Sequence, residues 1–208
     1  MKAVASLLGD VVGSREAPDR AALHRDLVDA MEQSNTDRSP IDPLHLTVGD
    51  EFQGAYTTVG EAIGAAADLQ HRLRPDIDVR IGIGWGGITR LDATIQDGPA
   101  WWSARRAIEE AKTLAHERAT AHVRVRYQRE DPSGPPESAI NAALDARDCL
   151  IARIRPRAAR ILHGLASGHS RSEIAEREGV SASAISQQIT TNDLETILRV
   201  DAALEEVT

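Results

Sequence analysis

Aromatic residues make up only 3% of this 208-residue sequence, so its cores must be built mainly from Ala, Leu, Ile and Val. The single cysteine, Cys149, excludes an internal disulfide and a cysteine metal cluster, and predicts a protein of the reducing cytoplasm. No apolar run approaches the roughly 18 residues that a membrane span requires, so no membrane contact is expected. The apolar start of the chain breaks at Gly9-Asp10, which is too early for a signal peptide and typical of a buried strand.

Positive charge is also in short supply, because the formal net charge is −8 at pH 7. A protein coated in nucleic acid would be basic, so any contact with DNA must come from a local patch. The hydrophobic content of 41% and charged content of 27% are ordinary for a globular protein. The length predicts one or two domains.

The clearest boundary in the chain is a segment rich in proline. Residues 128–136 hold three prolines and a glycine among charged residues, which cannot continue a helix or a central strand. We therefore predict a first domain over residues 1–128, a linker over 129–136 and a second domain over 137–208.

Strands and helices alternate in the first domain. The expected strands cover residues 3–8, 44–48, 52–57, 79–83 and 121–127, and the expected helices cover 18–33, 59–73 and 99–118. The second and third strands meet in a tight hairpin around Gly49-Asp50-Glu51. This order predicts an α/β (α+β) sandwich with helices on a mixed sheet that contains the β-hairpin.

The second domain is predicted to be all helical. A first helix covers residues 138–154 and a second covers 157–166, ending at Ser167-Gly168. Ser170 and Glu173 have the spacing of a capping box at the start of a third helix. Gly179 provides the positive φ of the next turn, and Ser181 caps a fourth helix.

Residues 155–191 resemble the helix-turn-helix of bacterial transcription regulators and of the sigma-factor region that reads promoters. Ala175, Gly179 and Ile185 carry that likeness, with a small residue at the helix crossing, glycine at the turn and a branched residue in the core. The resemblance implies a DNA-binding surface. Its expected residues are Arg171, Ser181, Ser183, Ser186, Gln187 and Thr190.

The charge of this region argues for weak, salt-sensitive binding by one copy of the chain. Residues 155–192 hold five arginines and three glutamates, a net charge of +2, and residues 193–208 carry −4. A homodimer would double the contacts. The final helix could provide the dimer seam through Leu194, Ile197, Leu198 and Leu204, and the alternative is a dimer through the first domain. The alternative is a helical bundle that contacts only proteins.

Two carboxylates in the first domain have positions suited to a metal. Asp10 follows the first strand and Asp50 lies in the hairpin, so hard oxygen ligands sit on rigid elements, as Mg²⁺ requires. Backbone amides of Gly13, Ser14 and Arg15 could cradle a phosphate. The alternative is that both aspartates are turn residues.

These motifs resemble the SatD family, through Gly9–Arg15, the hairpin sequence Gly49–Gly54 and Asp97–Ala100. More distantly, the layout is similar to class III nucleotidyl cyclases and diguanylate cyclases, in which two such acids bind two metals. Arg80–Gly84 is similar to a cyclase strand. The resemblance implies a nucleotide site. Its expected residues are Gly13, Ser14, Arg15, Gly49, Glu51, Trp102 and Arg106.

The sequence also departs from the cyclase pattern. Leu46 stands where cyclases carry the lysine that reads the base, and Trp102 stands where they carry an asparagine, although Arg106 can supply the arginine. Loss of one positioned donor typically lowers the rate by about 10²–10³-fold. These departures favour a binding domain, or an enzyme for a different nucleotide-like substrate. Trp101 and Trp102 could stack on a base or pack under the helix.

The favoured hypothesis is a cytoplasmic DNA-binding transcription regulator that senses a nucleotide or phosphorylated metabolite with Mg²⁺. The rival is a divergent nucleotidyl cyclase or nucleotidyltransferase controlled by the helical domain. A third possibility is a catalytically silent adaptor that binds protein.

Overall fold

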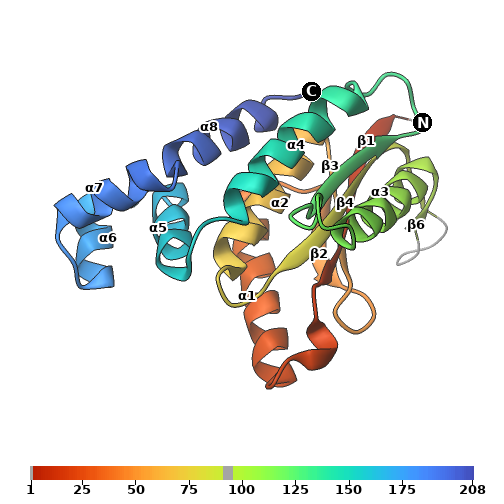
Figure 1. The fold of residues 1–208 in the computed structure, drawn as a ribbon. Coiled ribbons are helices and arrows are strands. Elements are labelled where there is room, and N and C mark those ends of the chain that lie inside the picture. Colours follow the sequence, from red (N-terminus) through yellow and green to blue (C-terminus); the bar gives the residue numbers. More distant parts are fainter. Residues whose placement is uncertain (1, 91–95) are drawn as a thin grey trace.

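The structure is a computed structural model that describes residues 2–90 and 96–208. Its centre is a mixed five-stranded sheet in the order β2-β3-β1-β4-β7 (Figure 1). The strands are β1 (Ala3–Val11), β2 (Asp42–Leu46), β3 (Phe52–Tyr56), β4 (Val79–Gly87) and β7 (Val125–Arg129). The predicted mixed sheet is confirmed, and β2 and β3 form the predicted hairpin.

Strand β1 lies at the centre of the sheet and is antiparallel to both of its neighbours, with Leu7 opposite Gly54 on β3 and opposite Ile83 on β4. Strand β4 is parallel to β7. A short pair, β5 (Thr89–Arg90) and β6 (Gln96–Asp97), lies beyond β4. A one-turn 3-10 helix (Ser14–Glu16) follows β1.

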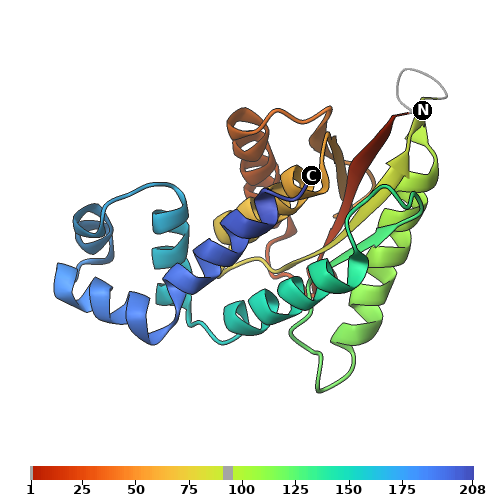
Figure 2. The same ribbon diagram turned by 90° about the horizontal axis from the view of Figure 1, so that it is seen from above.

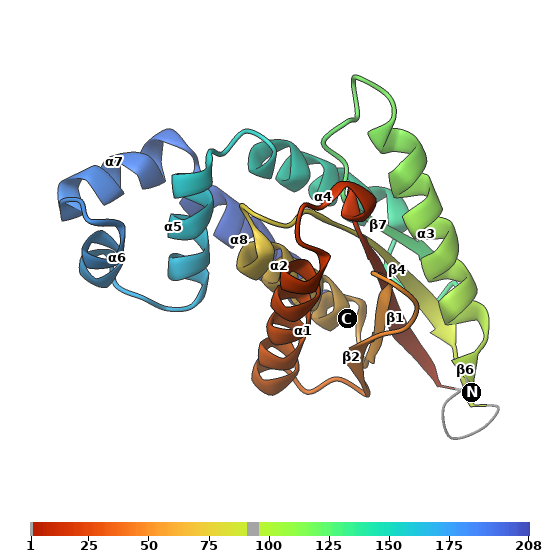
Figure 3. The same ribbon diagram turned by 90° about the horizontal axis from the view of Figure 1, so that it is seen from below.

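Helices cover both faces of the sheet. Helix α3 (Pro99–Ala115) lies on one face, and α1 (Arg20–Asp37) and α2 (Val59–Leu73) lie on the other, as Figure 3 shows. Residues of β1 alternate between the layers, because successive side chains of a strand point to opposite faces. Leu7 joins the core under α1 and α2, whereas Leu8 packs with Trp101 and Ala104 of α3.

Alternate glycines of β4 bring α3 unusually close to the sheet. A Cβ atom at Gly82 would lie 2.3 Å from the carbonyl oxygen of Ala104, and one at Gly84 would lie 2.1 Å from that of Ala100. Any larger residue would push the helix away. These glycines are therefore packing positions for α3, in keeping with the absence of a phosphate-loop motif around them.

Helix α1 runs to Asp37, four residues beyond its predicted end. The extra turn holds Asn35, whose side-chain amide donates to the carbonyl oxygen of Leu44 and whose oxygen accepts from the Leu44 amide, both within 2.9 Å. Tertiary hydrogen bonds thus override a weak helix propensity. The last strand begins at Val125 rather than at residue 121, because turns occupy Ala121 and His122.

Five helices complete the chain. They are α4 (Glu137–Ile151), α5 (Pro156–Ala166), α6 (Arg171–Glu178), α7 (Ala182–Thr191) and α8 (Leu194–Glu205). Helix α4 packs on the sheet, since its Ile140 and Leu144 belong to the core under α1 and α2. Helices α5 to α7 and the first half of α8 share a second hydrophobic cluster, called here the helical cluster. The domain division at residues 129–136 stays a prediction.

Helix α8 runs from the helical cluster back to α2, which Figure 2 shows from above. At its far end the Gly60 amide donates to the Val207 carbonyl oxygen at 2.8 Å. A Cβ atom at Gly60 would lie 2.2 Å from the Glu205 carbonyl oxygen, so this contact depends on glycine.

A buried polar network holds α8 in place. Asp201 of α8 accepts from His71 of α2 at 2.8 Å and from Arg147 of α4. The Arg147 guanidinium also donates to Gln70 at 2.5 Å. Asp148 accepts from the amides of Arg124 and Val125 at the start of β7. Helices α2, α4 and α8 and strand β7 are thereby tied together. Figure 1 shows that α6 and α7 lie at the end of the molecule farthest from the sheet.

Among the described residues, no helix has the length and apolar character needed to cross a membrane.

Candidate functional site

Asp10 lies near the end of β1 on the face covered by α3. Leu8 packs against α3, and Asp10 is two residues further on, so both side chains point to that face. Directly opposite on β4 stands Arg80, whose Nη1 donates to both carboxylate oxygens of Asp10 at 3.1 Å. The first predicted acid is therefore held by an arginine that follows from the strand register.

Burial raises the pKa of Asp10 above its ordinary value, although Arg80 and Lys112 act in the opposite direction. The charges of Asp50 and Glu51 raise the pKa further. The β1 end and the hairpin are therefore close enough to repel each other electrostatically. The structure brings together the two predicted acids and Glu51.

The hairpin loop that carries Asp50 is turned by Gly49, whose φ is +68°. Within the described residues, the Asp50 carboxylate has no hydrogen-bond partner, and Glu51 is 3.5 Å from Arg105 of α3. Gly13 likewise has a left-handed φ of +71° with open space around it. Ser14 is buried and Arg15 is exposed in the 3-10 helix after β1.

Two of the expected nucleotide contacts lie elsewhere. Helix α3 runs antiparallel to β4, and its Lys112 end is the one near Asp10, so Trp102 lies about 15 Å away along the helix axis. The Trp102 indole donates to Asp97 at 2.7 Å. Arg106 is bound to Glu130 at 2.7 Å and faces β7. Trp101, the neighbour of Trp102 in the sequence, is buried against the sheet. Of the two alternatives for this side chain, stacking on a base and packing under the helix, the structure shows packing.

The donor set at the β1 end fits a magnesium ion that also binds phosphate. The described residues contain no group of three or more metal-ligating side chains, so the protein would supply only the carboxylates of Asp10 and Asp50. Mg²⁺ is commonly held by one or two carboxylates, with water and phosphate oxygens completing the shell. Arg80, Lys112 and Arg105 lie around these acids and could contact phosphate oxygens.

The helical cluster forms a second candidate site, built from strong local signals. Ser170 and Glu173 make the predicted capping box. Gly168 and Gly179 both have positive φ and end α5 and α6 in the same way, each followed by a residue whose amide bonds back into the helix. The Ser181 hydroxyl accepts from the Ala184 amide at 3.1 Å and caps α7, as predicted.

Helix α7 buries Ile185 and Ile189 and exposes a polar, uncharged side. Three of its predicted DNA contacts already have partners within the chain. The Ser181 hydroxyl caps the helix, Ser186 donates to the Ala182 carbonyl oxygen, and Thr190 donates to that of Ser186. Within the described residues, Ser183 and Gln187 have side chains that are exposed and without partners.

Arg171 starts α6 and is held by its neighbours. Its guanidinium binds Glu195 of α8 at 2.7 Å and lies 3.4 Å from the Ser186 hydroxyl. The side chain is half exposed, so a phosphate group could compete with Glu195 for it.

The predicted dimer seam on α8 is wrong for three of its four residues. Leu194 and Ile197 are fully buried in the helical cluster, and Leu204 is buried in the core of the sheet. Leu198 packs partly against the helical cluster. A dimer contact through α8 would have to use residues other than these three.

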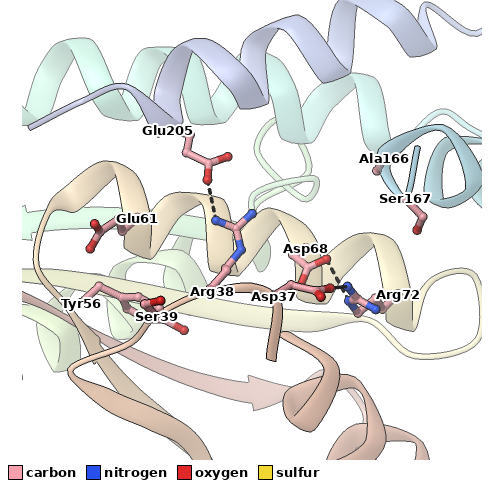
Figure 4. Close-up of a pocket in the computed structure, with 10 residues that line it drawn as sticks. All are labelled: Asp37, Arg38, Ser39, Tyr56, Glu61, Asp68, Arg72, Ala166, Ser167 and Glu205. Carbon is pink, nitrogen blue, oxygen red and sulfur yellow. Dashed lines mark hydrogen bonds and ion pairs between the residues drawn. The ribbon is translucent and has the colours of Figure 1, made fainter. Parts of the chain in front are cut away.

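The structure also contains a charged cavity of about 710 Å³ that no sequence motif predicted. Figure 4 shows Arg38 crossing it from the end of α1 to Glu205 of α8, at 2.6 Å, beside Tyr56 of β3. Arg72 binds Asp37 and Asp68 at its other end. Burial raises the pKa of Tyr56, so its hydroxyl is a neutral donor. With both signs of charge, the cavity suits a polar ligand rather than an apolar one.

One sequence signal points to this junction. Gly60 and Gly64 are four residues apart on an alanine-rich helix, the spacing that lets another element approach closely. A Cβ atom at Gly64 would lie 2.4 Å from the Arg38 guanidinium and 2.8 Å from the Glu205 side chain.

Comparisons with solved structures found adenylyl and guanylyl cyclases among the matches, with low similarity. A bacterial light-regulated adenylyl cyclase covers 60% of this chain and 74% of its own, with 14% identity and a TM-score of 0.44. A guanylyl cyclase domain of the RhoGC fusion protein from the aquatic fungus Blastocladiella emersonii covers 52% of this chain and 74% of its own, with 18% identity and a TM-score of 0.43. An adenylate/guanylate cyclase/hydrolase from Silicibacter pomeroyi covers 50% of this chain and 67% of its own, with 25% identity and a TM-score of 0.37.

A comparison with curated proteins found no match. The model of the SatD family, in contrast, matches residues 4–207. That match spans the sheet, the charged cavity and the helical cluster together. The chain therefore belongs to the SatD family.

Proposed function

We propose that this chain is a DNA-binding regulator in which α6 and α7 form a helix-turn-helix and α7 enters the major groove. One observation carries the proposal. Helix α7 presents an exposed, uncharged polar side at the end of the molecule farthest from the sheet (Figure 1), with Ser183 and Gln187 free of intrachain bonds among the described residues.

The chemistry of these two side chains suits base recognition. The major groove admits one α-helix, and a glutamine can donate to and accept from the edge of an adenine at the same time. A serine hydroxyl can serve any base. Ser181, Ser186 and Thr190, whose hydroxyls are engaged with the backbone, would contribute shape and backbone contacts rather than base selection.

The charge of the helical cluster favours binding as a homodimer. Arg160 and Arg171 are both paired with glutamates, so one copy offers phosphate only part of its positive charge. Two copies would read half-sites about one helical turn apart. The contact between them would lie outside the buried residues of α8.

The test is a selection of preferred sequences from a random duplex pool by the full chain, followed by binding titrations with Gln187→Ala. We expect the selected site to lose about 1–3 kcal/mol of binding free energy with the variant, while unselected DNA binds as before. Ser138→Ala, an exposed polar change on α4, is the control. Equal weakening on all sequences would contradict base reading by α7. No duplex binding at low salt would favour an adaptor that binds protein.

A second candidate function is the sensing of a nucleotide or phosphorylated metabolite with Mg²⁺ at Asp10 and Asp50. The supporting observation is that burial raises the pKa of Asp10, with the negative charges of Asp50 and Glu51 adding to it, and a bound cation would offset these charges. The neighbouring Arg80 and Lys112 favour a phosphate-bearing partner.

Thermal unfolding with nucleotides and Mg²⁺ tests this second function. A ligand at a hundredfold excess over its dissociation constant adds about 2.7 kcal/mol of stability. We expect this gain to disappear in Asp10→Asn/Asp50→Asn and to persist in Asp26→Asn/Asp29→Asn, which removes two exposed acids of α1. If the ligand still stabilises Asp10→Asn/Asp50→Asn, the two aspartates do not form the binding site. Product analysis of any hit would separate a sensor from a nucleotidyl cyclase or nucleotidyltransferase.

A further inference from the structure

The start of α5 and the connection before it have a charge opposite to that of the whole chain. The chain carries a net charge of −8, yet Arg153, Arg155, Arg157 and Arg160 fall within eight residues that include no acid. All four side chains belong to exposed residues. Such a local excess of arginine is the electrostatic feature expected where a phosphate backbone binds.

The structure places these arginines on the outer side of the helical cluster. Arg153 and Arg155 lie in the connection between α4 and α5, and Arg157 and Arg160 lie on the first two turns of α5. The opposite side of α5 buries Ala158, Ile161 and Leu162 in the cluster. The arginines therefore cannot turn inward without exposing that core.

One ion-pair group locates the arginines relative to α7. Glu178, the last residue of α6, binds Arg160 through both of its oxygens, at 2.7 and 2.8 Å, and lies 3.5 Å from Arg157. Helix α7 begins four residues later at Ala182, after its cap Ser181. The first turn of α5 is thus beside the turn that leads into α7.

Arg153 and Arg155 are the uncommitted members of the set. Within the described residues neither guanidinium has a hydrogen bond or an ion pair, and Arg155 precedes α5 without capping it through its side chain. A guanidinium offers a rigid fork of donors that matches two phosphate oxygens.

We infer that Arg153, Arg155 and Arg157 form a phosphate anchor that holds the backbone of a DNA duplex beside α7. The inference rests on the proposed DNA binding and deepens it, because it separates the residues that supply affinity from those that read bases. Arg153 and Arg155 make contacts that do not depend on sequence, and Arg157 joins them by exchanging Glu178 for phosphate. Gln187 selects the bases.

Salt dependence is the measurement that separates these roles. Each phosphate contact changes the slope of log Kd against log salt by about 0.9 for duplex DNA. We expect Arg153→Ala/Arg155→Ala in the full chain to lower that slope by about 1.8, on selected and unselected duplexes alike. Fluorescence anisotropy between about 50 and about 200 mM salt gives the slope.

Two comparison variants make the result specific. Arg25→Ala/Arg118→Ala removes two exposed arginines elsewhere, which have no partner among the described residues, and should leave the slope unchanged. Gln187→Ala should weaken binding to the selected site without changing the slope. Thermal unfolding checks that each variant stays folded.

The outcomes distinguish this inference from the proposed function. If the unaltered chain binds duplex DNA and Arg153→Ala/Arg155→Ala keeps its slope, the anchor is wrong and the proposed function stands. If the unaltered chain binds no duplex at low salt, both fail, and an acidic protein surface becomes the alternative partner of these arginines. A lowered slope in the Arg25→Ala/Arg118→Ala control would also overturn the assignment, because the effect would then be general.

Discussion

The two halves of α8 differ in the interactions that hold them. Its first half inserts Leu194 and Ile197, both fully buried, into the apolar helical cluster. Its second half places Leu204 in the apolar core of the sheet and adds charged groups, with Asp201 bound to His71 and Arg147, and Glu205 bound to Arg38. One helix therefore joins two apolar cores, and only its second half adds buried charged groups.

The difference separates stability from orientation. Apolar contacts are non-directional, so Leu194 and Ile197 can hold α8 to the helical cluster without fixing its angle to the sheet. Hydrogen bonds between charged groups require defined geometry, and those of Asp201 fix α8 against α2 and α4. We expect the ionic half to set how the helical cluster is presented and the apolar half to keep it folded.

The largest effect is expected from Arg147→Ala. The change leaves the buried carboxylates of Asp201 and Asp148 without their common cation, and breaking a buried pair typically costs about 3–5 kcal/mol. Urea unfolding measures the loss, and hydrogen exchange should show increased opening of α8 against α2. Arg118→Ala, on the surface, is the control. A change below about 0.5 kcal/mol would mean that the network contributes nothing net.

A somewhat smaller effect is expected from Ile197→Ala in the apolar half. Removing a fully buried isoleucine costs about 2–5 kcal/mol, and Ile197→Val should cost about 0.5–1.5 kcal/mol. Hydrogen exchange should show loss of protection in α5, α6 and α7 while the sheet stays protected. Equal loss of protection in the helices and in the sheet would show that the two cores unfold as one unit. The two halves of α8 would then not have separate roles.

The smallest effect is a dependence on pH that only the ionic half should show. Burial alone would raise the pKa of Asp201, but Arg147 and His71 outweigh it and hold the pKa below its ordinary value of 3.8. At pH values above 3.8, Asp201 therefore adds to the free energy of unfolding. This contribution is lost as the pH falls through the lower pKa that Asp201 has in the folded state. Below pH 3.8, the free energy of unfolding should fall less steeply in Asp201→Asn than in the unaltered chain. Parallel curves for the two proteins would contradict the assignment.

Local signals of the helical cluster were read correctly from the sequence because each of them acts within a few residues. The Ser170–Glu173 capping box, the left-handed Gly179 and the Ser181 cap are all present. Helix α2 has the predicted bounds, since Thr58 and Glu61 also form a capping box. The hairpin between β2 and β3 follows equally from a short turn.

Contacts between distant segments were the part that the sequence could not supply. The Asp10–Arg80 pair depends on the register of β1 against β4, and the wide separation of Trp102 from Asp10 depends on the direction of α3. The charged cavity joins residues as far apart as Arg38 and Glu205. The α8 residues expected to form a dimer seam were apolar because they serve two internal cores, which periodicity alone cannot distinguish from an exposed seam.

The sequence by itself determined the mixed α/β part, its hairpin and the caps and turns of the helices. Capping, glycine turns and period-2 or period-3.6 patterns are local, so they can be read from neighbouring residues. The tertiary structure decided which acids meet, which serines of α7 remain free and how α8 joins the helical cluster to the sheet. Those outcomes depend on register, helix direction and buried ion pairs, which arise only when segments far apart in the chain come together.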